Sequence, residues 1–356
     1  MSISRNFVHT ALPGRVIFGP GTQRVVAEEL SRLGCSRGFV LSGPNGAAGA
    51  RALQDQLGAQ ATGVFTSAAM HTPVEITERA LRDVRVHGAD ALIALGGGST
   101  IGLAKAIALR TDLPQIVIPT TYAGSEMTPI LGETAGDRKT TVRDPKVLPE
   151  VIIYDVELTY SLSQALSVTS GMNAIAHAVE ALYAKDGSPI VSIIATEAIR
   201  VMARALPAIV VNSRDETARS DALYAAWLCG FVLASVGMAL HHKLCHVLGG
   251  SFNMPHAQTH TVLLPHTTAF NAPAVPDKLA PVAELLGSPG PGQGLYSLAQ
   301  RIGAPSSLKE LGFPEDALDR AADIAMEQPY WNPRALSREG IRGLLDDAWH
   351  GRRPAS

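Results

Sequence analysis

The first half of the chain alternates short apolar runs with stretches that place an apolar residue every three or four positions. The runs predict strands, and the stretches between them predict helices. Their regular alternation indicates a parallel sheet with helices on both faces. The predicted strands are Arg15–Phe18, Gly38–Leu41, Gly63–Phe65, Ala91–Leu95, Gln115–Ile118 and Val151–Tyr154. The predicted helices are Thr22–Leu33, Ala50–Leu57, Val74–Val86 and Thr100–Ala108, and a β-ribbon is predicted near Lys139–Val142.

The pattern changes after about residue 160, where strand signals nearly vanish. Alanine-rich stretches predict helices at Ser188–Leu206, Glu216–Ser235 and Glu315–Met326, and the segment Gly287–Gly294 predicts a loop. We therefore predict an α/β domain over residues 1–158 and an all-helical domain over residues 159–356. The active site is expected in a cleft between them, where binding sites usually lie.

Composition excludes several classes of partner. The 356 residues are 46% hydrophobic and 17% charged, with a net charge of −2 and no long run of one sign. We therefore expect neither nucleic acid nor an anionic membrane surface as a partner. No apolar run reaches the roughly 20 residues of a membrane span. The N-terminus lacks a hydrophobic signal core, so we expect a cytoplasmic protein.

The three cysteines do not form a recognisable framework. Cys35, Cys229 and Cys245 are odd in number and lack metal-ligand spacing, which argues against structural disulfides. Cys245 lies between His242 and His246, a pattern that a thiol nucleophile would also show. We expect a buried, inert thiol instead.

A glycine-rich loop joins a predicted strand to a predicted helix. Gly96, Gly97, Gly98 and Ser99 follow the strand Ala91–Leu95. A strand, a glycine loop and a helix together present free backbone N–H groups and a positive dipole end to a phosphate. A tight turn without a ligand would use the same residues, so the loop alone leaves both interpretations open.

A second, hydroxyl-rich loop, PTTYAGSEMT, follows the strand Gln115–Ile118. In open α/β sheets, ligands bind at the carboxyl ends of the strands. We therefore predict cofactor contacts from Thr120, Thr121, Ser125 and Thr128, and we add Lys139 of the predicted ribbon. The alternative is a capped turn that binds nothing.

Six of the eleven histidines fall within one short segment: His241, His242, His246, His256, His260 and His266. His242 and His246 share one helix face, as do Asn173 and His177. The pair Gly249 and Gly250 is predicted to end the first histidine-bearing helix, and Met254–His256 to begin the next. Such density indicates a functional cluster, in which His260 and His266 can also serve structure.

These motifs resemble the iron-containing alcohol dehydrogenase superfamily. The segments GGGS, PTT with GSE.T, the GMNAIAH helix and the histidine-rich segment occur in its order over nearly the whole chain. The resemblance implies a Rossmann-like dinucleotide-binding α/β domain and an all-helical domain, as in the dehydroquinate synthase-like fold. It also implies an oxidoreductase with a nicotinamide cofactor, assembled as a homodimer.

One departure from the superfamily concerns metal. Metal-dependent members hold an ion with one Asp and three His, and the corresponding positions here are Asn173, His177, His242 and His256. A neutral amide is a poorer ligand for a hard cation than a carboxylate, although three imidazoles can hold zinc. In this substitution the chain resembles the maleylacetate reductase branch, and the resemblance implies an enzyme that works without a metal ion. Gly102, in GGGSTIGLAK, also stands where the superfamily often has an Asp, and Gln258 replaces an expected Glu.

The branch implies reduction of the C=C bond of maleylacetate, a dicarboxylate from aromatic-compound degradation, to 3-oxoadipate. Hydride addition leaves an enolate whose charge is spread by conjugation, so hydrogen-bond donors can suffice without a Lewis acid. Clustered imidazolium groups would attract the dianion. The expected catalytic or substrate-contacting residues are His242 and His246 first, and then His177, His241, His256, Asn173 and Tyr330.

Cofactor preference depends on the residues after the second predicted strand. NAD-selective relatives often carry an Asp there, but Ser42–Asn45 contains no acid. We therefore expect NADH and NADPH both to be accepted, with Ser42 and Asn45 near the cofactor. Two alternatives remain: a metal-dependent alcohol or lactaldehyde dehydrogenase of the same superfamily, and a nucleotide-binding protein without catalysis.

Overall fold

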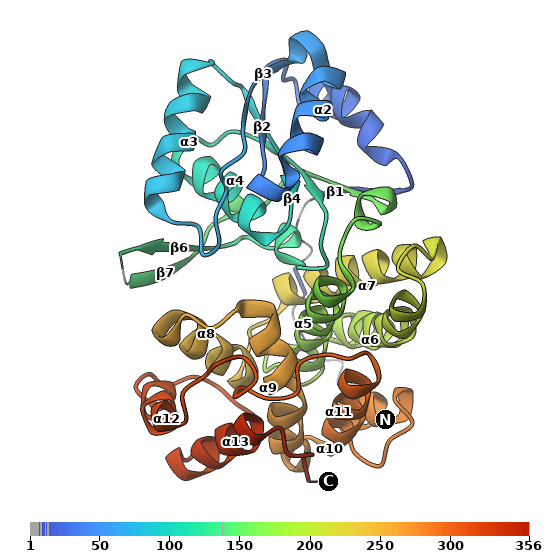
Figure 1. Cartoon of the computed structure of the whole chain (residues 1–356), viewed down its shortest axis with the longest axis vertical. Helices are drawn as coiled ribbons and strands as arrows, with labels where there is room; N and C mark the ends of the chain where they lie inside the picture. The colour runs from blue at the N-terminus through green and yellow to red at the C-terminus, as the bar shows by residue number, and fades with distance from the viewer. Residues whose placement is uncertain (1–6, 8, 11, 13, 137, 356) are drawn as a thin grey trace. The chain divides into compact units, whose positions relative to one another are not determined.

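A computed structural model describes residues 7, 9, 10, 12, 14–136 and 138–355, without the side chains of residues 138 and 139. The chain divides into two compact units: residues 12–162 form the first, and residues 163–355, with Phe7, His9 and Thr10, form the second. The first unit is built on a parallel sheet, and the second is built from helices (Figure 1).

The first unit contains a six-stranded parallel sheet with the order β1-β8-β5-β4-β2-β3. Its strands are β1 (Arg15–Gly19), β2 (Gly38–Leu41), β3 (Ala61–Phe65), β4 (Ala91–Gly96), β5 (Gln115–Pro119) and β8 (Val151–Asp155). All six predicted strands are confirmed, with ends that differ by two residues at most. β6 (Ile130–Ala135) and β7 (Arg138–Arg143) pair in antiparallel register, which confirms the predicted β-ribbon.

Helices cover both faces of the sheet because its strands are apolar at successive positions. Val40 and Ile93 pack with α1 (Val26–Arg32) and α2 (Ala47–Leu57), whereas Phe39 and Leu92 pack with α3 (Val74–Val86) and α4 (Gly98–Thr111). Neighbouring residues of a strand point to opposite faces, so a continuous apolar run is buried on both faces of the sheet. Figure 1 shows α2 and α3 on either side of the strands.

The second unit consists of nine α-helices among the described residues. They are α5 (Gln164–Tyr183), α6 (Pro189–Val211), α7 (Glu216–Ser235), α8 (Leu240–Phe252), α9 (His256–Asn271), α10 (Pro276–Leu285), α11 (Pro291–Arg301), α12 (Leu318–Met326) and α13 (Arg338–His350). α5 is buried from Ser167 onward and packs against α6, α7 and α9. The hydroxyl of Ser163 accepts a hydrogen bond from Leu166 N and caps the start of α5.

Several predicted boundaries are wrong. The helix predicted over Ser188–Leu206 continues to Val211. The helix predicted over Thr22–Leu33 begins as a 3-10 turn at Thr22–Val25, and the one over Glu315–Met326 begins as a 3-10 turn at Glu315–Ala317. α11 begins at Pro291, inside the predicted loop, because proline suits the first turn of a helix.

Gly249 and Gly250 do not end α8, which continues to Phe252. The helix ends instead at Asn253, whose φ of 53° is left-handed, and the N–H of the following Met254 donates to the carbonyl of Leu248 at 3.1 Å. Asparagine tolerates this conformation better than most residues, so the asparagine provides the stop that the glycines were expected to give. Pro255 then precedes the first turn of α9.

No single helix among the described residues is long and apolar enough to cross a membrane. The pair α7 and α8 meets that criterion only when taken together, and it is bent by 97° at the break.

Candidate active site

The predicted phosphate loop lies where the sheet changes direction. β2 and β4 are neighbours, but the chain continues from β2 to β3 on one side and from β4 to β5 on the other. Open α/β sheets bind ligands at the carboxyl edge of such a switch point. Leu41 is in register with Ala94, so Ser42 and Gly96 follow at the same edge.

The glycine loop lies close to the hydroxyl-rich loop. A Cβ at Gly97 would lie 2.9 Å from Thr121 Cγ2 and 3.0 Å from its hydroxyl, so glycine gives room for the Thr121 side chain. No side chain caps α4 and no acid lies in its first turn, which leaves the helix start open to an anion. The loop therefore fits the pyrophosphate of a dinucleotide.

The other predicted cofactor residues lie in different environments. Asn45 is exposed, whereas Ser42 is fully buried. The hydroxyl of Ser125 is buried without a hydrogen-bond partner, and that of Thr128 is bonded within the loop. The remaining loop residues, Gly98, Ser99, Thr120 and Thr121, are half-buried or exposed. Lys139 lies in β7, and its side chain is outside the described part of the structure.

Lys105 holds the hydroxyl-rich loop in place. Its ammonium donates to the carbonyl oxygens of Ser125, Thr128 and Ile130 at 2.5, 2.7 and 3.0 Å, and it lies 3.0 Å from Thr128 Oγ1. The side chain is 1% exposed, and burial lowers the pKa of Lys105 to about 7 against the opposing charge of Glu126. Sequence reasoning missed this residue, although a lysine inside an otherwise apolar helix was a usable signal.

Gly102 packs against a neighbouring segment with an unusual backbone conformation. Thr72 has a φ of 47°, which is uncommon for a β-branched residue. A Cβ at Gly102 would lie only 2.4 Å from the Thr72 hydroxyl, so a larger residue requires that hydroxyl to rotate or the segment to move. A glycine at this position fits the present packing without either change.

The histidine cluster is assembled from three helices of the second unit. α5 contributes Asn173, His177 and Glu180, which lie on one face because they are four and three residues apart. α8 and α9 pack against each other and bring in the rest: His241, His242, Cys245 and His246 from α8, and His256 and His260 from α9. The ring of His260 lies 4.3 Å from that of His256 and 4.9 Å from that of His242, measured between centroids.

A hydrogen-bonded chain runs through the cluster. His242 Nδ1 lies 2.6 Å from Glu180 Oε2, His242 Nε2 lies 2.8 Å from His177 Nδ1, and Asn173 Nδ2 lies 3.4 Å from His177 Nε2. A carboxylate only accepts, so His242 donates through Nδ1. When both rings are neutral, His177 donates through Nδ1 to His242 Nε2. His177 Nε2 then carries a lone pair and accepts from the amide of Asn173.

Glu180 fixes the direction of this chain. Burial raises its pKa, but the hydrogen bond and charge of His242 prevail and lower the pKa of Glu180 to about 2. The backbone N–H groups of Ala239 and His241 also donate to it, at 3.1 and 2.9 Å. Glu180 was missed from the sequence. Its position, three residues after His177 on an otherwise apolar helix, was the available signal.

A second buried chain contains His241. Its ring bonds to Thr267 Oγ1 at 3.0 Å and to His260 Nδ1 at 2.9 Å. Burial lowers the pKa of His241 to about 3, that of His266 to about 4 and that of His260 well below its usual value. The expectation of clustered imidazolium groups is therefore wrong for these three rings, because desolvation disfavours their charged form.

The thiol of Cys245 lies in the same buried place, as expected. Its sulfur is 3.7 Å from His241 Nε2, and burial raises the pKa of Cys245 well above the usual value. His241, Cys245 and His260 are the only described His, Cys, Asp and Glu residues grouped closely enough to hold an ion. A protonated thiol and two mutually bonded imidazoles do not suit one.

The positions of the superfamily ligands also fail to fit a metal ion. Position 173 offers an amide oxygen, which is buried without a partner, in place of a carboxylate. His242 Nε2, which a metal would need, accepts from His177. These side chains are thus arranged as members of a hydrogen-bonded chain rather than as ligands of a metal ion.

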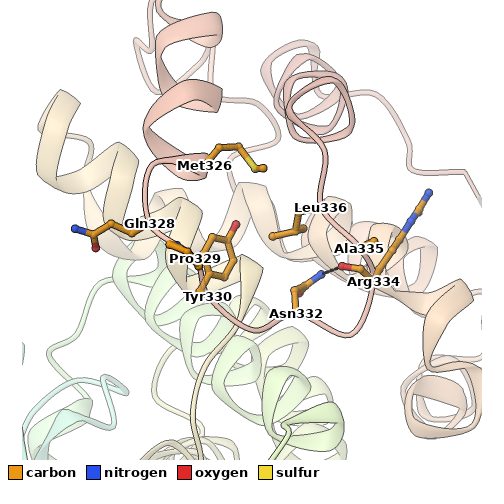
Figure 2. Close-up of a pocket in the computed structure, with 8 residues that line it drawn as sticks. All are labelled: Met326, Gln328, Pro329, Tyr330, Asn332, Arg334, Ala335 and Leu336. Atoms are coloured by element: carbon orange, nitrogen blue, oxygen red, sulfur yellow. Dashed lines mark hydrogen bonds between the residues drawn. The ribbon is translucent and has the colours of Figure 1, made fainter.

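The remaining predicted residues lie around the cluster. His246 is exposed, and its ring stacks at 6.5 Å on that of His256, which is half-buried. Tyr330 is half-buried with its hydroxyl buried and unpartnered, and burial, together with the charge of Glu180, raises the pKa of Tyr330 above its usual value. Tyr330 lines a cavity of about 250 Å³ (Figure 2).

Comparison with known proteins identifies the family of the chain. The family model described as iron-containing alcohol dehydrogenase matches residues 13–156. The model described as the C-terminal part of the Fe-containing alcohol dehydrogenase family matches residues 167–349. A maleylacetate reductase of Rhizobium sp. (strain MTP-10005) is 57% identical, over 98% of this chain and 99% of its own length.

Solved structures show the same likeness. The crystal structure of maleylacetate reductase from Agrobacterium tumefaciens is 56% identical with a TM-score of 0.95, over 98% of this chain and 100% of its own. An iron-containing alcohol dehydrogenase from Corynebacterium glutamicum is 42% identical with a TM-score of 0.94, over 99% of both chains. Both matched models and these relatives cover the two units described above, so this chain belongs to the iron-containing alcohol dehydrogenase family, in which it stands with the maleylacetate reductases.

Proposed function

We propose that this protein reduces the C=C bond of maleylacetate to 3-oxoadipate with NADH or NADPH, in the cytoplasm and without a metal ion. The observation that carries the proposal is likeness to maleylacetate reductases over almost the whole chain, at 57% identity in the Rhizobium relative. The hydrogen-bonded chain at Asn173 supports it, because the reaction calls for proton transfer and enolate stabilisation.

The cofactor is proposed to bind at the switch point of the sheet. The glycine loop and the start of α4 would hold the pyrophosphate, with Ser125 and the other predicted loop residues around it. When bound, the cofactor supplies the hydride. The absence of an acid at Ser42–Asn45 supports acceptance of the additional phosphate of NADPH.

The histidine chain is proposed to deliver the proton that completes the reduction. Both nitrogens of His242 are engaged, so its role is to relay and orient, and the substrate-facing end of the chain is His177 Nε2. The chain takes up a proton at His177 Nε2, which carries its lone pair, and the positive charge is then shared with His242 and balanced by Glu180. Donation of that proton from His177 Nε2 to the substrate returns the chain to its neutral state. His246, His256 and Tyr330 are proposed to contact the substrate, and His241 to support the packing of His242.

Asn173 suits this relay better than an Asp would. Its amide nitrogen donates to His177 Nε2 when that atom carries a lone pair. After the ring gains a proton there, the amide oxygen, which is buried without a partner, becomes the acceptor once the amide turns over. A carboxylate would serve only the protonated state and would also attract a cation.

The function is tested by following NADH oxidation with maleylacetate. We expect turnover with either cofactor, and kcat/KM values for NADH and NADPH that differ by less than about a hundredfold, because no acid repels the 2′-phosphate. The control is a panel of simple aldehydes and alcohols. A protein that turns over the panel and leaves maleylacetate untouched is the metal-dependent alcohol dehydrogenase, and one inert to every substrate is a binding protein only.

Metal independence is tested by chelation. We expect full activity in EDTA and well under one divalent ion per chain. Asn173→Asp should raise zinc affinity at least about tenfold, because it restores a charged ligand, and added zinc should then inhibit maleylacetate reduction. Stoichiometric metal in the wild type, with activity lost on chelation and regained on readdition, would contradict the proposal. The expected homodimer can be checked by light scattering.

A further inference from the structure

The proposed substrate carries two carboxylates, and the buried histidines do not provide the charge to bind both. His241 and His260 are fully enclosed and bonded to each other, and Glu180 adds a negative charge to the cluster. A dianion in this place needs a cation that is free of other partners. The residue that follows His242 in α8 supplies such a cation.

Lys243 is that cation. It follows His242 in α8 and is half-buried, and among the described residues no carboxylate forms an ion pair with its ammonium. Its Nζ lies 5.5 Å from the centre of the Tyr330 ring. A lysine over a tyrosine face is held by the ring quadrupole, which leaves its N–H donors available to a ligand.

Tyr330 presents a second unused donor. Its hydroxyl is buried and unpartnered, and the ring lines the cavity of about 250 Å³ shown in Figure 2. That volume lies just below the roughly 300–1,000 Å³ of pockets for drug-sized ligands, as suits a small acid. A buried hydroxyl without a partner is costly unless a ligand satisfies it.

The neighbouring arginine already has other partners. The Arg334 guanidinium donates to the carbonyl oxygen of Phe270 at 2.8 Å and stacks on its ring at 4.2 Å, and Figure 2 shows it directed away from Tyr330. Asn332 fastens the segment to the histidine cluster, because its amide oxygen accepts from Leu240 N at the start of α8, at 3.4 Å. Lys243 is thus left as the available cation beside Tyr330.

We propose that Lys243 and Tyr330 form a carboxylate-binding subsite that holds one end of the dicarboxylate substrate. The inference rests on the proposed function and adds a specificity-determining residue to it. It assigns to Lys243 a role in binding, separate from the hydrogen-bonded chain that handles the proton.

The test compares Lys243→Met with Lys309→Met. Lys309 is a matched control, since its ammonium also lies over an aromatic ring, that of Trp349, at 4.9 Å. We expect Lys243→Met to raise both the KM for maleylacetate and the inhibition constant of adipate about 10- to 100-fold, the usual worth of a charged hydrogen bond. Its kcat and its KM for NADH should stay within about threefold of wild type. Lys309→Met should change none of these values.

Two further variants refine the test. Lys243→Arg keeps the charge and should bind adipate better than Lys243→Met, and Tyr330→Phe should weaken adipate binding by about three- to tenfold. Circular dichroism establishes that each variant is folded. Adipate inhibition equal in Lys243→Met and wild type, in a protein that reduces maleylacetate, would overturn the subsite alone. A wild type inert toward maleylacetate would overturn the proposed function and the subsite with it.

Discussion

Replacing His242 by alanine is expected to lower kcat at least about 100-fold while the protein stays folded, because positioned acid–base groups contribute about 10²–10⁴-fold. The substitution removes the central ring of the chain between Glu180 and His177. It also leaves Glu180 as a buried carboxylate without its closest donor. Single-turnover kinetics with maleylacetate separate this loss from slower binding. His246→Ala is also expected to lower kcat strongly, whereas His350→Ala, at the exposed end of α13, should not.

Glu180→Gln distinguishes a relay from simple packing. The two side chains have nearly the same shape, and the amide oxygen of Gln takes the place of Oε2, because that atom accepts from Ala239 N as well as from His242 Nδ1. The hydrogen-bond pattern of both rings is then kept, but the negative charge that balances a protonated chain is lost. We expect kcat to fall while the nitrogen chemical shifts of labelled histidine show the same tautomers as in the wild type. Unchanged kcat would show that Glu180 serves packing only.

The largest stability effect is expected from Lys105→Met. Three buried carbonyl groups lose their donor, and each unsatisfied group costs about 1–3 kcal/mol, so we expect a loss of about 2–5 kcal/mol after partial hydration. The loop that includes Ser125 would lose its anchor, so the KM for NADH should rise. Urea unfolding of wild type and variant measures the first effect, and steady-state kinetics the second.

Lys146→Met is the matched control for Lys105→Met. Lys146 is about half exposed and pairs with the exposed Asp112 at 3.5 Å. A surface ion pair contributes about 0–1 kcal/mol, so its removal should hardly change the unfolding midpoint. Equal stability of the two variants would mean that the contacts of Lys105 do not hold the loop.

Much of the fold follows from hydrophobic periodicity alone. All six strands were predictable because buried parallel strands are continuous apolar runs, and Val74–Val86 matches α3 at both ends. The boundaries that failed depend on local backbone choices. Asn253 ends α8 through a left-handed conformation that its neighbours permit, and no periodicity in the sequence indicates which of three small or polar residues takes it.

That Asn173 and the histidines would lie near one another was predictable, but the hydrogen bonds that connect them were not. The density of histidines pointed to α8 and α9, and the spacing of Asn173 and His177 to one face of α5. Glu180, Lys105 and Lys243 were missed because each acts through a partner far away in the sequence. Which ring is neutral also depends on burial, and burial is a property of the packed helices rather than of the histidine count.

The contact between Gly102 and Thr72 has a consequence for substitutions at either position. With Thr72 in its present rotamer, its hydroxyl would be 2.4 Å from the first side-chain atom of any other residue at position 102. A side chain at position 102 therefore requires this hydroxyl to turn away by rotation about χ1, or the segment that carries Thr72 to move. The effects of substitutions at the two positions should thus be non-additive, which a double-mutant cycle would measure.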